Sequence, residues 1–148
     1  MTTIKSYTSI EQSRKLAEIL PLESADMVLP FRHTKNDEYI PEHVVSRNYV
    51  EVYNEMIKLP GMGKEDICQL IQPAWSLAAL LGVLPKIINN ETLFIETSAA
   101  LWHIGYRNIY IARVDNPIDA CYELILKLHE FKIYKLSEQL KKLREEDV

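Results

Sequence analysis

The chain has 148 residues, of which 47% are hydrophobic and 26% charged, so it is long enough to bury a core and too apolar to be disordered throughout. Its formal net charge of −4, from 17 basic and 21 acidic side chains, gives no general attraction to nucleic-acid phosphates. The longest apolar run, residues 74–84, is too short to cross a bilayer, and residues 1–12 lack the apolar block of a secretory signal. The sequence therefore predicts a cytoplasmic protein without a membrane partner.

The first predicted helix begins after Ser9. The Ser9 hydroxyl can accept a hydrogen bond from the Gln12 amide, and the Gln12 side chain can bond back to the Ser9 amide, which is the capping-box pattern. Pro21 should end this helix because a proline disfavours helical backbone in the residue before it.

A short strand and a loop are expected next. Residues 25–29 are mostly apolar and end at Pro30, which predicts a brief strand. Residues 31–43 are polar and carry turn-forming side chains, which predicts an exposed loop.

Three helical segments are predicted in the middle of the chain. From Val45 the apolar residues recur at helical spacing as far as Pro60, and residues 64–71 predict a shorter helix. Pro73 suits the first turn of a helix, and residues 74–84 are apolar nearly all round. They predict a helix that is buried on every side.

The last third of the chain predicts a meander followed by a helix. Residues 92–97, 101–106 and 109–114 are rich in β-branched and aromatic side chains and are separated by short turns, which predicts three antiparallel strands. Asn116 should cap a final helix whose first residue is Pro117.

The order of these elements predicts the fold class. We expect an α+β fold in which a small antiparallel sheet of three or four strands packs against several helices, including residues 74–84 as one buried central helix. No repeat, low-complexity tract or linker interrupts the sequence, which predicts a single globular domain over residues 1–148.

The two cysteines, Cys68 and Cys121, stand in helix-forming segments without a CxxC motif or a Cys/His metal spacing. Unpaired cysteine is among the most buried residue types. The sequence therefore predicts free, buried thiols rather than a disulfide or a zinc site.

The segment LPGMG, residues 59–63, joins two predicted helices and resembles the helix-hairpin-helix motif. In that family the hairpin glycines bring backbone amides close to a DNA phosphate, which implies Gly61, Gly63 and Lys64 as contact residues. The two acidic residues at 65–66 would repel that phosphate, and the neighbouring basic residues form no patch. A Pro-Gly corner between two helices is the preferred interpretation, and DNA binding is kept as the second hypothesis.

Imidazole and carboxylate side chains gather in the predicted loop, where His33, Glu42 and His43 are candidate metal ligands. Their spacing fits no metal template, so a solvated polar loop is preferred and a metal-dependent enzyme is the third hypothesis. Phosphate-loop, dinucleotide and nucleophile-elbow signatures are missing as well. The sequence therefore favours a protein without enzymatic activity and predicts no cofactor.

Aromatic and leucine side chains offer possible contact surfaces. Tyr106 and Tyr110, near a predicted strand turn, either pack in the core or line a binding surface, because amphipathic rings supply much contact area with few rotatable bonds. Leu136, Leu140 and Leu143 form a one-sided stripe that must pack against the domain or against a second copy. A homodimer is thus left open.

Four blocks of the sequence carry a wider resemblance: residues 7–13 (YTSIEQS), 16–27 (LAEILPLESADM), 73–85 (PAWSLAALLGVLP) and 115–130 (DNPIDACYELILKLHE). With these blocks the chain resembles a group of small uncharacterised proteins encoded on phages and conjugative elements of gut bacteria. We know no activity for that group, so the resemblance implies a genomic setting and no catalytic residue.

A scaffold without a recognisable reactive constellation favours a non-enzymatic protein-interaction protein. We expect an accessory or host-modulating factor of a phage or mobile element, whose partner is another protein bound through an exposed helix or sheet face.

Overall fold

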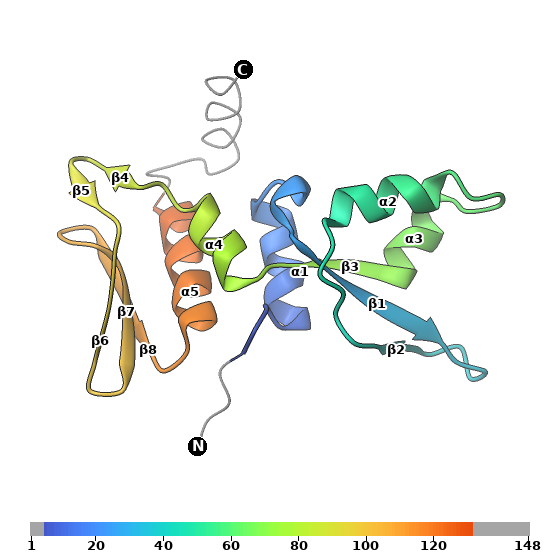
Figure 1. The fold of residues 1–148 in the computed structure, drawn as a ribbon, viewed down its shortest axis with the longest axis horizontal. Helices are drawn as coiled ribbons and strands as arrows, with labels where there is room; N and C mark the ends of the chain where they lie inside the picture. The colour runs from blue at the N-terminus through green and yellow to red at the C-terminus, as the bar shows by residue number, and fades with distance from the viewer. Residues whose placement is uncertain (1–4, 132–148) are drawn as a thin grey trace.

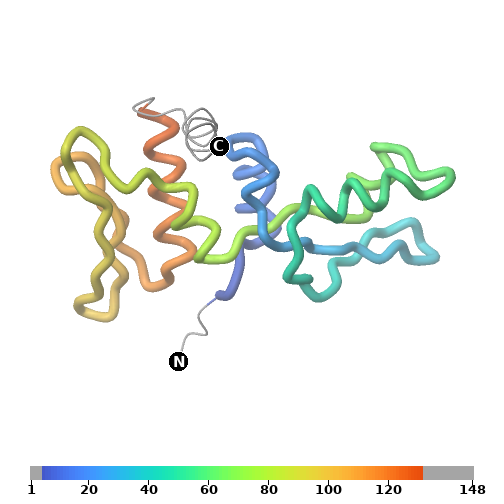
Figure 2. The backbone as a smooth tube through the Cα atoms, turned by 45° about the horizontal axis from the view of Figure 1, so that its top comes forward, coloured from blue at the N-terminus to red at the C-terminus, as the bar shows by residue number. Residues whose placement is uncertain are grey.

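Helix α1 (Ile10–Ile19) lies in the middle of the molecule, with one half of the chain on each side of it (Figure 1; Figure 2). The computed structural model describes residues 5–131. Over these residues it contains five α-helices and three small antiparallel sheets, so the predicted α+β fold is confirmed. A three-stranded sheet stands in the N-terminal half, and a two-stranded and a three-stranded sheet stand in the C-terminal half.

The start and the end of α1 follow the sequence prediction. Ser9 Oγ accepts from the Gln12 amide at 3.2 Å, and Gln12 Oε1 accepts from the Ser9 amide at 3.0 Å, so the capping box is confirmed. The helix ends at Ile19, two residues before Pro21. Leu16, on its inner side, is fully buried.

The N-terminal half is a sheet covered by two short helices. Its elements are η1 (Leu22–Ser24), β1 (Met27–His33), β2 (Tyr39–Pro41), α2 (Tyr49–Ile57), α3 (Lys64–Leu70) and β3 (Ile71–Ala74). The strand order is β2-β1-β3, with both pairs antiparallel, and α2 and α3 lie together on one side of the sheet (Figure 1). The second helix begins later than predicted because Val45 is held against Val28 by two backbone hydrogen bonds.

The prediction of a loop over residues 31–43 is wrong in part. Strand β1 continues through Pro30 to His33 and pairs with β2 as a hairpin. Pro30 still supplies its carbonyl, which accepts from the Glu42 amide at 2.8 Å. The proline therefore removes only one ladder donor, at the point where β2 has already ended.

The predicted role of Pro73 is also wrong. Pro73 is paired with Val28 inside β3, and the helix that follows, α4 (Leu77–Val83), starts after the cap residue Ser76. The backbone groups of Val28 are already bonded to Val45 on the opposite side, so the pairing requires no amide hydrogen from Pro73. Helix α4 is shorter than predicted, and it buries Leu80 and Val83 while Ala78 and Gly82 stay exposed.

The C-terminal half agrees with the prediction except for the hairpin over residues 87–92, which the sequence did not predict. Its elements are β4 (Ile87–Ile88), β5 (Glu91–Thr92), β6 (Phe94–Ser98), β7 (Leu101–Tyr106), β8 (Tyr110–Val114) and α5 (Pro117–Glu130). The antiparallel meander β6-β7-β8 is confirmed, as is the Asn116 cap with Pro117 in the first turn of α5. Helix α5 packs along one face of this sheet (Figure 1).

One hydrophobic cluster runs through both halves and α1. It includes Leu16, Val28, Ile67, Trp75, Ile104, Tyr106 and Leu124. Cys121 belongs to this cluster and is a free buried thiol as predicted, whereas Cys68 is exposed, so the prediction for Cys68 is wrong. The reason is local, because Ile67 supplies the buried side of the short helix α3 and its neighbour Cys68 points elsewhere.

None of the helices within residues 5–131 has the length and apolar character needed to span a bilayer. The predicted dimerisation stripe of Leu136, Leu140 and Leu143 lies outside the described residues.

Candidate functional site

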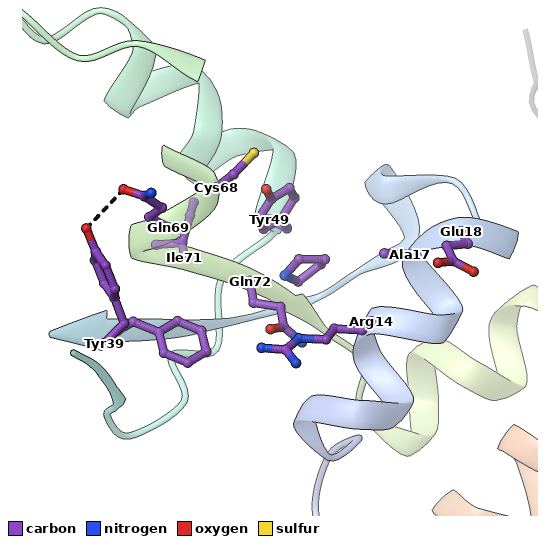
Figure 3. A pocket seen from close by; sticks show the side chains of 11 residues that line it. Arg14, Ala17, Glu18, Tyr39, Tyr49, Cys68, Gln69, Ile71 and Gln72 are labelled. Atoms are coloured by element: carbon purple, nitrogen blue, oxygen red, sulfur yellow. Dashed lines mark hydrogen bonds between the residues drawn. The ribbon is translucent and has the colours of Figure 1, made fainter. Parts of the chain in front are cut away.

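A groove of about 590 Å³ runs beside β3 in the N-terminal half, between α1 on one side and α2 and α3 on the other (Figure 3). Elements far apart in the sequence form it. Its lining residues are Arg14, Ala17 and Glu18 from α1, Phe31 and Tyr39 from the hairpin, Tyr49 from α2, Cys68 and Gln69 from α3, and Ile71, Gln72 and Pro73 from β3.

The register of the sheet decides which backbone groups of β3 face this groove. The amide and the carbonyl of Val28 both bond to Val45, so they are not available to β3. Pro73, which stands opposite Val28 in β3, therefore points its carbonyl away from β1. Successive residues in a strand alternate, so Ile71 and Trp75 turn the same way. The Trp75 carbonyl does accept from the Thr8 amide at 3.0 Å on this side. The outer edge of β3 therefore directs the carbonyls of Ile71 and Pro73 away from the sheet.

This edge is rich in acceptors and poor in donors. The Ile71 amide donates to the Ile67 carbonyl at the end of α3, and Pro73 has no amide hydrogen. Within residues 5–131 the Ile71 and Pro73 carbonyls accept no hydrogen bond on this side. Two such carbonyls next to an apolar floor favour a ligand that brings N–H groups.

Helix α1 contributes two side chains of opposite charge to the groove, and only one of them has an ion-pair partner within the described part of the chain. Glu18 pairs with Lys15 on the same helix at 3.6 Å and points away from Gln72 in Figure 3. Arg14 extends from α1 toward Gln72, and it makes no ion pair or hydrogen bond with any residue in the described range 5–131. The groove therefore presents one free guanidinium group.

The opposite wall is aromatic and polar. The Tyr39 hydroxyl donates to Gln69 Oε1 at 2.9 Å, and the ring of Tyr39 stacks on His33 with centroids 4.9 Å apart. Burial raises the pKa of the Tyr49 phenol to about 12, with smaller contributions from Cys68 and Tyr53. At neutral pH the phenol therefore stays protonated and uncharged.

The helix-hairpin-helix candidates stand at the far end of the N-terminal half. Helices α2 and α3 are joined by the expected tight turn, in which Gly61 has φ +74°. The Gly63 amide already donates to Asp66 Oδ2 at 2.8 Å, and Lys64 follows as an exposed residue. One of the amides that would meet a phosphate, that of Gly63, is thus bonded inside the protein, a contact that sequence reasoning missed although Asp66 stands three residues after Gly63.

The metal candidates are divided between the two faces of the β1-β2 hairpin. His33 Nε2 lies 3.2 Å from Asp37 Oδ1 and shares its face with Tyr39. Glu42 and His43 line a separate hollow of about 500 Å³ with Arg32. Within residues 5–131 we find no group of three His, Cys, Asp or Glu side chains placed to hold a metal ion.

The two tyrosine candidates differ in exposure. Tyr106 is fully buried, and its hydroxyl donates to the Pro85 carbonyl, so its ring belongs to the core. Tyr110 is half-buried; its hydroxyl donates to Glu123, and its ring lies against Phe131 with centroids 6.4 Å apart. The Tyr110 pKa is raised to about 12 by burial and by Glu123.

A smaller hollow of about 400 Å³ lies on the outer face of the β6-β7-β8 sheet. Glu96, His103 and Arg113 stand directly opposite one another across the three strands, and Ser98 Oγ lies 3.0 Å from His103 Nε2. His103 separates the carboxylate of Glu96 from the guanidinium of Arg113, and no ion pair joins these three side chains, so the row supplies no site of its own.

Comparison of the chain with protein-family models, with curated proteins and with solved structures found no match.

Proposed function

We propose that this chain is a protein-interaction protein without catalytic activity, and that it binds an extended segment of a partner polypeptide in the groove beside β3. The observation that carries the proposal is the acceptor-rich outer edge of β3, set in a groove of about 590 Å³. An extended peptide offers a main-chain N–H at every second position on one side, which suits carbonyls spaced two residues apart.

The chain itself supplies a precedent for such pairing. Thr8 lies along the same edge of β3, where its amide donates to the Trp75 carbonyl and its hydroxyl accepts from the Trp75 amide, both at 3.0 Å. A bound segment would continue this pairing toward Pro73 and Ile71. The rings of Phe31 and Tyr39 and the side chain of Ile71 would provide the apolar contacts of an anchor residue.

The biological setting belongs to the same proposal. On the resemblance described above, we propose that the protein is an accessory or host-modulating factor of a phage or mobile element, and the sequence analysis adds the expectation that it acts in the cytoplasm. DNA binding at the hairpin receives less support, because Asp66 occupies the Gly63 amide. Two carboxylates at the start of α3 would also oppose a phosphate.

The exposed thiol of Cys68 provides a direct test, because it lines the groove while Cys121 is buried. Octapeptides would be selected from a random displayed library against the full chain, and their affinities measured by fluorescence anisotropy. A bulky maleimide adduct on Cys68 should abolish binding of the selected peptides. The matched control is Cys68→Ser treated with the same reagent, which should bind as the untreated protein does.

Two outcomes would contradict the proposal. One is a selection that yields no specifically bound peptide. The other is a set of peptides that bind equally well to the protein with and without the Cys68 adduct, which would place their site elsewhere.

A further inference from the structure

Arg14 lines the groove and has no ion-pair partner among residues 5–131. Four other lysine and arginine side chains of the described residues have carboxylate partners within 4 Å: Lys5 with Asp119, Lys15 with Glu18, Arg47 with Glu55 and Lys127 with Glu130. Arg14 has no such contact within residues 5–131, although its side chain extends across the groove toward Gln72 (Figure 3).

The surroundings of Arg14 do not cancel its charge. Glu18, one turn further along α1, is the other charged residue that lines the groove, and its carboxylate lies 3.6 Å from the Lys15 ammonium group rather than against Arg14. The remaining lining side chains are uncharged phenols, amides, an apolar floor and the Cys68 thiol. A guanidinium beside an apolar surface binds a carboxylate strongly, since its planar fork matches the two carboxylate oxygens.

We infer that the bound segment is acidic: an aspartate or glutamate side chain pairs with Arg14, and an apolar side chain two positions away packs on Phe31 and Ile71. This inference rests on the proposed function. In an extended segment the side chains at positions i and i+2 point to the same face, about 7 Å apart. The pattern recognised is therefore an acidic residue and an apolar residue separated by one position, in either order.

A nucleic acid would present phosphates to the same guanidinium, but it fits the rest of the groove poorly. The outward carbonyls of Ile71 and Pro73 need donors, and a phosphate backbone supplies acceptors. A single-stranded oligonucleotide therefore serves as the counter-probe.

The test uses the full chain and the same random octapeptide library. Peptides selected by the wild type should be enriched in Asp or Glu at one fixed position. Arg14 is exposed, so Arg14→Ala should weaken their binding by about two- to five-fold, the usual size of a lost ion pair at a protein surface. Arg14→Glu should select Lys or Arg at that position instead. Arg113→Ala, an exposed arginine on the other half of the molecule, is the matched control and should change nothing.

The outcomes separate the two proposals. Peptides that are blocked by the Cys68 adduct but show no acidic enrichment, or whose affinity ignores Arg14, would overturn this inference and leave the proposed function standing. Arg14-dependent binding of an oligothymidine in preference to the acidic peptides would overturn it as well. A failure to select any peptide would contradict the proposed function itself.

Discussion

The two three-stranded sheets of this molecule differ in how their strands are paired and in where their prolines lie. In the C-terminal half, β7 is paired over nearly its whole length with β6 on one side and β8 on the other, and none of the three strands contains a proline. In the N-terminal half, β1 is paired with β3 over its first four residues and with β2 over its last three. Each of these strands contains one proline: Pro30, Pro41 and Pro73.

The difference has a physical consequence for function. A proline removes one backbone donor and leaves the carbonyl, so a sheet with a proline in every strand exposes edges that accept more than they donate. Such edges resist self-association with another sheet edge, yet they can take an incoming N–H group. Under the proposed function, the C-terminal half would be the scaffold and the N-terminal sheet the binding surface.

The largest expected contrast between the halves is in thiol reactivity. Cys68 is exposed at the groove, whereas Cys121 is buried under the C-terminal sheet and burial raises its pKa to about 12. Because Cys121 should react only when the protein opens, its rate with a thiol reagent should be lower by roughly a thousand-fold. Reaction time courses of Cys68→Ser and Cys121→Ser would measure the two rates. Similar rates would mean that the C-terminal half opens easily and is no rigid scaffold.

Gly105→Ala should strongly destabilise the C-terminal sheet. A Cβ at this position would lie 2.2 Å from the Tyr110 carbonyl oxygen and 2.7 Å from Ile111 Cα, and both are backbone atoms of β8. We expect the free energy of unfolding to fall by about 3 kcal/mol or more, measured by urea titration. Gly82→Ala is the control, because its Cβ would meet nothing within 4 Å and a helical alanine should stabilise by about 1 kcal/mol. Equal effects of the two substitutions would contradict the tight packing of β7 on β8.

The same substitution, tyrosine to phenylalanine, should have unequal effects in the two halves. Tyr106→Phe removes a buried hydroxyl bonded to the Pro85 carbonyl and should lower the free energy of unfolding by about 1–2 kcal/mol. Tyr39→Phe removes an exposed hydroxyl bonded to Gln69 and should change it by less than about 0.5 kcal/mol. A larger loss at Tyr39 would show that the groove wall is part of the stabilising core.

The smallest expected difference between the two halves is in the alkaline pH dependence of the free energy of unfolding, to which one tyrosine from each half contributes. The pKa values of Tyr49 in the N-terminal half and Tyr110 in the C-terminal half are both raised from 10.0 to about 12. Since the folded protein holds these phenol protons more tightly than the unfolded chain, their stabilising contribution is complete below about pH 10 and is lost as the pH rises toward 12. Urea titrations at several alkaline pH values should show this decline, and Tyr49→Phe or Tyr110→Phe should each make it shallower. A free energy of unfolding that stays constant over this range would contradict the burial of both phenols.

The two halves also differ in how well their structure could be predicted from the sequence alone. In the C-terminal half, alternating β-branched residues and the Asn116-Pro117 start of α5 are local signals, and local signals were sufficient. In the N-terminal half, Pro30 and Pro73 are normally read as breaks, but their effect depends on which side of the strand each backbone group faces. That side is set by pairing with distant residues such as Val45, which no local pattern reveals.

The candidate site was harder to predict for the same reason. Arg14, Phe31, Cys68 and Pro73 come from four elements, and none of them forms a motif with its sequence neighbours. The prediction of a buried Cys68 followed the general preference of cysteine, whereas Ile67 takes the inner side of α3. Glu18 could pair with Arg14 or with Lys15 at helical spacing, and the structure places it 3.6 Å from Lys15, which the sequence alone does not decide.

The alkylation rate of Cys68 in the presence of a saturating selected peptide tests the central claim most directly. If the segment lies along β3 in the groove, the peptide should slow the modification of Cys68 severalfold in proportion to the bound fraction. A peptide of the same composition in scrambled order should leave the rate unchanged. An unchanged rate with the selected peptide bound would show that the groove beside β3 is not the binding site.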